Sequence, residues 1–159
     1  MKQRLNSNLI TFAVVAILAV AVGLVLGRPD AGRSFSRALA TAVESGQTPV
    51  KLGSLPSPDW ERVFLFGPYT SSAQISTALG FTYSGPDTES SDGQTLLVFV
   101  SGRKVVFTAQ HPRKQGDFAP AALGKPFARE AAEFSVSSQN GWRLLTPVPD
   151  LGDNGPPSV

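Results

Sequence analysis

Residues 60–70 read WERVFLFGPYT, and this order of apolar, turn-forming and aromatic residues predicts a buried β-strand. Residues 63–66 are apolar at every position and rich in β-branched and aromatic side chains, as in a strand covered on both faces. Pro68 ends the strand, because proline has no N–H to donate to a strand ladder. We expect Trp60 and Tyr69 to hold the two ends of the strand in the core.

A short helix and a strand hairpin are predicted downstream of this strand. Ser71 and Gln74 have the spacing of a capping box, and Gly80 closes the helix that follows. The runs TLLVFV and KVVFTAQ then flank Ser101–Lys104, where Gly102 suits the first central position of a tight turn. The order along the chain is therefore strand, helix, strand, strand.

A second helix and a loop are predicted upstream. Residues 34–45 carry apolar side chains at helical spacing, with Ser34 as the expected N-cap. Residues 46–59 are rich in proline and glycine and are expected to form a linker-like loop, either a linker or a loop that wraps the domain.

Further strands are expected near the carboxyl end. Residues 131–137 alternate between polar and apolar, and the sequence WRLL after the Asn140–Gly141 turn predicts a returning strand. Residues 147–159 are rich in proline and glycine and are expected to be disordered. The predicted fold class is α+β, a small domain at 28–146 with an amphipathic helix and a β-α-β-β core plus one or two further strands.

An apolar run occupies residues 9–27 and contains no charged side chain. A helix of this length spans about 28 Å, close to the hydrocarbon thickness of a bilayer, so we expect a transmembrane helix. Residues 1–8 are basic and form the expected cytoplasmic tail, which places the domain outside the cytoplasm. The alternative is a secretory signal cleaved after the A-x-A sequence at 19–21, which would release the protein.

Small residues recur every four positions within the apolar run, at Ala19, Gly23 and Gly27. Such spacing lets two membrane helices approach closely, and it predicts a helix–helix contact that would form a homodimer.

Charge and composition exclude several classes of protein. Lys2 and Arg4 account for the net charge of +2, so the rest of the chain is neutral overall, which argues against a nucleic-acid partner. The chain has no cysteine, and therefore no disulfide, zinc–thiolate site or thiol nucleophile. The lack of free thiols also agrees with an extracytoplasmic location.

No motif predicts a catalytic residue, a metal site or a cofactor. Ser101 and Lys104 have the spacing of an acyl-enzyme serine–lysine pair, but they fall on a predicted hairpin turn without the partner elements. His111 is the only histidine, and the acids Asp87 and Glu89 lie in a polar loop that lacks the calcium-loop pattern. A basic edge that contacts anionic polymer or lipid headgroups is the remaining candidate. Its residues are Arg103, Lys104, His111, Arg113 and Lys114.

The stretch from Trp60 to Thr70 resembles a motif of small bacterial proteins with an amino-terminal anchor, W-[DE]-x-[VL]-x-x-F-x-P-Y-[TS] followed by a helix that ends in Leu-Gly. The matching residues are Trp60, Glu61, Val63, Phe66, Pro68, Tyr69 and Thr70. The resemblance covers residues 60–110 best, and that group has no assigned activity. It implies a structural motif, in which Phe64 is also a core residue, or a ligand pocket.

The function that these patterns favour is a membrane-tethered, extracytoplasmic interaction module without catalytic activity, in the cell membrane, with a protein or an envelope polymer as its partner. Two alternatives remain open. One is an inhibitor or immunity-type protein, and the other is a small hydrolase that uses serine and His111.

Overall fold

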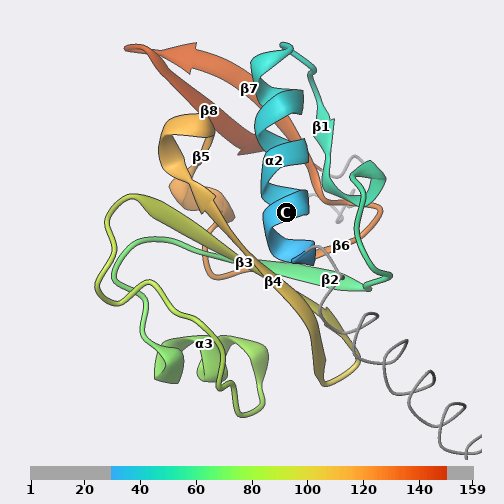
Figure 1. Ribbon diagram of the computed structural model, residues 1–159, viewed down its shortest axis with the longest axis vertical. Coiled ribbons are helices and arrows are strands. Elements are labelled where there is room, and N and C mark those ends of the chain that lie inside the picture. Colours follow the sequence, from blue (N-terminus) through green and yellow to red (C-terminus); the bar gives the residue numbers. More distant parts are fainter. Residues whose placement is uncertain (1–29, 150–159) are drawn as a thin grey trace, which may run out of the picture. The chain divides into compact units, whose positions relative to one another are not determined.

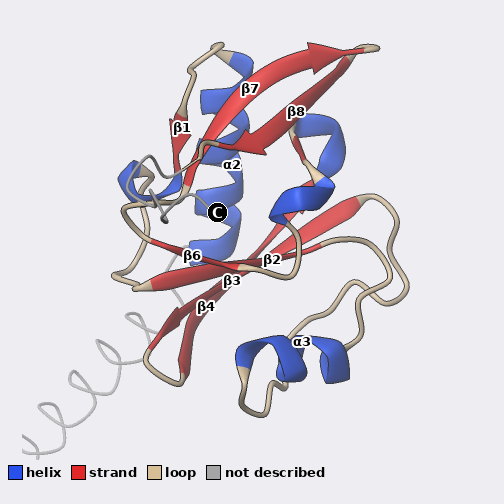
Figure 2. Ribbon diagram, turned by 180° about the vertical axis from the view of Figure 1, so that it is seen from behind, coloured by secondary structure: helices blue, strands red, loops and turns tan. Residues whose placement is uncertain are grey.

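The computed structural model describes residues 30–149, which form an α+β fold (Figure 1). Residues 31–149 belong to one compact unit. Two four-stranded sheets and two α-helices make up the described part of the chain, with short 3₁₀ turns between them (Figure 2). The predicted fold class is confirmed at this level.

The first sheet has the strand order β4-β3-β2-β6. Its strands are β2 (Arg62–Phe66), β3 (Gln94–Ser101), β4 (Lys104–Pro112) and β6 (Pro126–Ala128). All neighbouring strands in it are antiparallel, and β3 and β4 form the predicted hairpin, in which Gly102 has φ +56°. The helix α3 (Ser72–Leu79) connects β2 to β3.

Both faces of β2 are buried, as its composition predicts. Val63 and Leu65 face the main core, together with side chains of the second sheet and of α2 (Ala31–Glu44). Phe64 and Phe66 face the opposite way and pack with α3 in a smaller cluster. The larger cluster contains seventeen buried side chains whereas the smaller contains eight, so the sheet has a thick and a thin apolar layer.

The caps of α3 agree with the prediction. The Ser71 side chain accepts a hydrogen bond from the Gln74 N–H, and the Gln74 side chain accepts one from the Ser71 N–H, which completes the capping box. Gly80 ends the helix in the left-handed region with φ +74°, where a side chain would be strained.

The helix α2 begins three residues before the sequence indicates, so Ser34 lies inside it and is not its N-cap. Phe35, Leu39 and Val43 form its fully buried stripe. Its first turn lies against β4, where a Cβ on Gly32 would come within 2.0 Å of the Thr108 carbonyl oxygen. This close approach requires glycine at position 32.

The second sheet has the strand order β1-β7-β8-β5 and holds more strands than expected. The predicted hairpin is present as β7 (Glu133–Gln139) and β8 (Trp142–Pro147). The additional strands of the sheet are β1 (Val50–Lys51) and β5 (Asp117–Phe118). Strands of two residues carry no alternation that a sequence pattern could reveal.

Residues 46–59 form a loop that wraps the domain, the second of the two predicted alternatives, and are not a free linker. Val50 and Leu52 are fully buried in the main core, β1 pairs with β7, and a 3₁₀ turn covers Leu52–Ser54. The segment is therefore part of the domain, and its proline-rich chain packs against the core.

The fold extends past its predicted end, because Pro147 belongs to β8 and the Val148 N–H donates to the Glu133 carbonyl. Residues 150–159 lie outside the described residues, as do the predicted span at 9–27 and the predicted helix contact at Ala19, Gly23 and Gly27. None of the helices between residues 30 and 149 has the length and apolarity needed to cross a membrane.

Candidate functional site

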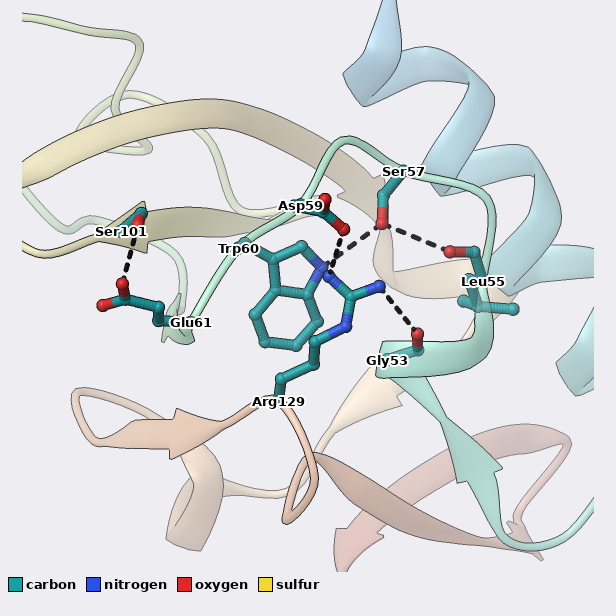
Figure 3. A network of polar contacts seen from close by, with 8 residues as sticks. All are labelled: Gly53, Leu55, Ser57, Asp59, Trp60, Glu61, Ser101 and Arg129. Carbon is teal, nitrogen blue, oxygen red and sulfur yellow. Dashed lines mark hydrogen bonds and ion pairs between the residues drawn. The ribbon is translucent and has the colours of Figure 1, made fainter.

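The Trp60 side chain is buried, and its contacts are those of a residue that stabilises the fold. Its ring is 3% exposed and packs edge-on against Phe99, with ring centroids 5.0 Å apart. The indole N–H donates to Ser57 Oγ at 3.2 Å, and the Arg129 guanidinium lies 5.2 Å from the ring centroid (Figure 3). Arg129 also donates to the Gly53 carbonyl at 3.2 Å. These contacts fix the segment before β2, and Trp60 holds its end of the strand as predicted.

Glu61 secures the turn between β3 and β4. Its carboxylate accepts a hydrogen bond from Ser101 Oγ at 2.8 Å (Figure 3). It also accepts one from the Gly102 N–H at 2.8 Å. The bond from Gly102, followed by the one from Ser101, lowers the pKa of Glu61. The Ser101 hydroxyl therefore has a structural partner, and although Ser101 and Lys104 are opposite each other in the β3–β4 ladder, no hydrogen bond joins these two described side chains.

Tyr69 does not hold the other end of the strand. Its side chain is 66% exposed, and its backbone lies in the left-handed region with φ 61°. A bulky residue in that region costs roughly 1–3 kcal/mol and persists only where the surroundings impose it. Phe64 and Phe66 are buried and Pro68 is half-buried, so the exposed tyrosine follows a strand that is otherwise in the core.

Thr88 imposes the conformation around Tyr69. The Thr88 side chain is 1% exposed and donates to the Gly67 carbonyl at 2.6 Å. The Tyr69 N–H donates to the Thr88 carbonyl at 2.8 Å, and the Thr88 N–H donates to the Thr70 carbonyl at 3.2 Å. Thr70 Oγ1 adds a second bond to the Gly67 carbonyl at 2.9 Å. The turn that presents Tyr69 is therefore held by hydrogen bonds at Gly67, Tyr69 and Thr70.

The loop that carries Thr88 is itself fixed to α3. Asp87 accepts a hydrogen bond from Ser72 Oγ at 2.7 Å and one from the Glu89 N–H at 3.2 Å, and these bonds, that from Ser72 first, lower its pKa. The Tyr83 hydroxyl donates to the Pro86 carbonyl at 2.7 Å. The Asp87 carboxylate therefore orders this loop, and within residues 30–149 no three His, Asp or Glu side chains gather as metal ligands.

Two features flank Tyr69. An open hollow of about 350 Å³ is lined by the chain on either side of it, including Pro68 and Thr70, and by Leu123. Arg113 makes a two-pronged ion pair with Asp117, at 2.8 and 2.7 Å. That pairing raises the pKa of Arg113, and the electrostatic effects of Asp92 and Tyr69 act in the same direction. We call Tyr69, this hollow and Arg113 the Tyr69 surface.

The predicted basic edge is not one surface. Arg103 and Lys104 lie at the start of β4, whereas Arg113 and Lys114 follow its end. A strand of nine residues separates the two pairs by about 27 Å. The length of β4 therefore keeps the two basic pairs at opposite ends of the strand.

His111 is also not part of an edge, because it is fully buried. Its Nδ1 lies 3.0 Å from Ser36 Oγ, and its Nε2 has no hydrogen-bond partner within the described residues. Burial lowers the pKa of His111 to about 4. Ser36 is 7% exposed, and no carboxylate orients the ring within the described part of the chain, so this pair lends no support to a Ser/His hydrolase.

Sequence reasoning missed Thr88, which acts through contacts with residues about twenty positions away. A threonine in a polar loop gives no signal of such a role. The likeness of residues 60–70 to anchored bacterial proteins stays a prediction. In comparisons of the chain with protein-family models, curated proteins and solved structures, none matched it.

Proposed function

We propose that this chain is a membrane-tethered, extracytoplasmic interaction module that binds a protein partner through the Tyr69 surface. The tether is the apolar run at 9–27. The observation that supports binding is Tyr69 itself, a bulky side chain held exposed in a strained backbone conformation. Such strain is found where it presents a side chain for a function.

The chemistry of the surface suits a protein partner. Tyrosine and arginine are enriched among the residues that contribute most to protein–protein binding. Tyr69 can bury its ring and keep its hydroxyl hydrogen-bonded, while Arg113 is already ordered by Asp117 and loses little freedom on binding. The hollow beside Pro68 can accept an apolar side chain of the partner.

Photo-crosslinking tests this proposal. A photoreactive phenylalanine analogue replaces Tyr69 in the full-length chain, made in the cells that naturally contain it. We expect one discrete crosslinked species that depends on light. The matched control places the analogue at Trp142, which is 49% exposed on the other sheet. No discrete species at position 69, or the same species from both positions, would contradict the proposal.

A further inference from the structure

A second concave surface lies at the start of β4. This groove has a volume of about 450 Å³ and an apolar wall formed by Phe81 and Val105, whereas the ring of Phe107 packs on Phe99 in the main core. Arg103 and Lys104 stand on its rim, and neither Asp nor Glu lines it within the part of the chain that the structure describes. We call it the β4 groove.

The two basic side chains of the β4 groove, Arg103 and Lys104, differ in how firmly they are held. Arg103 donates to the Gly80 carbonyl at 3.0 Å, and its guanidinium lies 5.9 Å from the centre of the Phe81 ring. It is therefore held over the apolar wall with other N–H groups still available. Lys104 is exposed, and no ion pair with it occurs among the described residues. An apolar wall under an ordered guanidinium and an exposed ammonium complements a ligand with an anionic head.

The position of the groove indicates which anionic ligand it meets. Thr108 lines the groove and also contacts Gly32 in the first turn of α2. In both ribbon views that first turn lies against the first sheet, and the β7–β8 turn lies toward the far end of α2 (Figures 1 and 2). Only residues 28–30 separate α2 from the predicted span, and three extended residues reach at most about 11 Å.

We infer that the β4 groove docks on the membrane surface, with Arg103 and Lys104 on the phosphate of an anionic lipid headgroup and the apolar wall against the glycerol and upper acyl region. This inference rests on the proposed tethering by residues 9–27. Basic side chains close to an anionic leaflet are attracted to it, and amphipathic surfaces insert at the headgroup level. Docking there leaves the β7–β8 turn directed away from the bilayer.

Fluorescence quenching tests the docking. The natural chain has no cysteine, so Thr82→Cys gives a single fluorophore in the groove and Ser138→Cys gives a matched one on β7. The full-length chain is reconstituted in phosphatidylcholine vesicles that carry a spin-labelled headgroup, with or without phosphatidylglycerol. Both leaflets have the same composition, so either orientation of insertion is reported.

We expect stronger quenching at position 82 than at position 138, and an increase at 82 when phosphatidylglycerol is present. Each basic residue near an anionic surface favours docking by about five-fold, so Arg103→Ala with Lys104→Ala should remove that increase. Lys114→Ala with Lys125→Ala removes the same charge elsewhere and should leave it intact. Equal quenching at 82 and 138, or unchanged quenching in the Arg103/Lys104 variant, overturns the docking alone. A chain that does not float with vesicles overturns the tether as well.

Discussion

The side chain of Thr88 donates a 2.6 Å hydrogen bond to the carbonyl of Gly67, across twenty-one residues of sequence. The bond joins the loop before β3 to the end of β2, and Thr88 also accepts a bond from the Thr70 N–H at 3.3 Å. The conformation of Tyr69, which lies between those two partners, follows from this one threonine.

Replacing Thr88 with valine should therefore loosen the turn without changing its volume. The substitution leaves the partly buried Thr70 N–H without its side-chain partner and takes one of two donors from the Gly67 carbonyl, at a cost of roughly 1–3 kcal/mol. Denaturant unfolding measures this loss. Ser90→Ala, in the same loop but exposed, should stay within about 0.5 kcal/mol of the natural protein. Equal stability of the two variants would show that Thr88 does not impose the turn.

Substitutions at Tyr69 should separate stability from binding. Tyr69→Gly relieves the left-handed strain at little cost in contacts, so the unfolding temperature should stay the same or rise. Tyr69→Val should lower stability by about 1 kcal/mol, because β-branched residues tolerate positive φ poorly. Both variants should lose the partner. A glycine variant that unfolds more readily than the natural protein would mean that the tyrosine ring supports the fold.

The buried His111 should make stability depend on pH. Its pKa falls from the ordinary value of 6.5 to about 4 on folding, so the unfolded chain binds a proton that the folded chain does not. The stability that this provides is complete above pH 6.5 and is lost as the pH falls toward 4, by roughly 3 kcal/mol in all. Denaturant unfolding between pH 7 and 4 measures it, and His111→Gln should flatten the curve. An unchanged slope in that variant would assign the effect to carboxylates.

The two tryptophans form a natural pair of core and surface substitutions. Trp60→Ala should cost about 3–5 kcal/mol because its ring is buried among Phe99, Arg129 and neighbouring side chains. Trp142→Ala should cost less than about 1 kcal/mol, since that ring is half-exposed at the β7–β8 turn. Thermal unfolding of the fragment 28–159 measures the fall in unfolding temperature that each of the two substitutions causes. Similar shifts for both would contradict a central role for β2.

The parts of the fold that sequence predicts are those with local signals. The capping box of α3, the left-handed Gly80 and the Gly102 turn each depend on residues within four positions of one another. The parts it misses depend on distant partners. Ser36 meets His111 across seventy-five positions, and β5 is a two-residue strand that exists only because it pairs with β8.

Tyr69 shows the same limit at the candidate site. An aromatic residue beside a buried strand is normally a core residue, and the composition of residues 60–70 gives no sign of a positive φ. The turn points the ring outward because Thr88 fixes the backbone, and that contact is not local. The sequence therefore identifies residues 60–70 as the segment to examine, but it wrongly places the Tyr69 side chain in the core.

Thiol labelling in intact cells tests most directly whether the domain lies outside the membrane with its Tyr69 surface occupied. Glu89→Cys places a single thiol next to Thr88, whose carbonyl accepts the hydrogen bond from the Tyr69 N–H, so this thiol reports on the Tyr69 surface. Trp142→Cys places a single thiol on the other sheet. A membrane-impermeant maleimide is added to cells, or to spheroplasts where an outer membrane is present. We predict that position 142 reacts in cells and in purified protein alike, whereas position 89 reacts quickly only when purified or when Tyr69→Ala is added. If neither thiol reacts until the membrane is broken, or if both react equally in intact cells, the account is wrong.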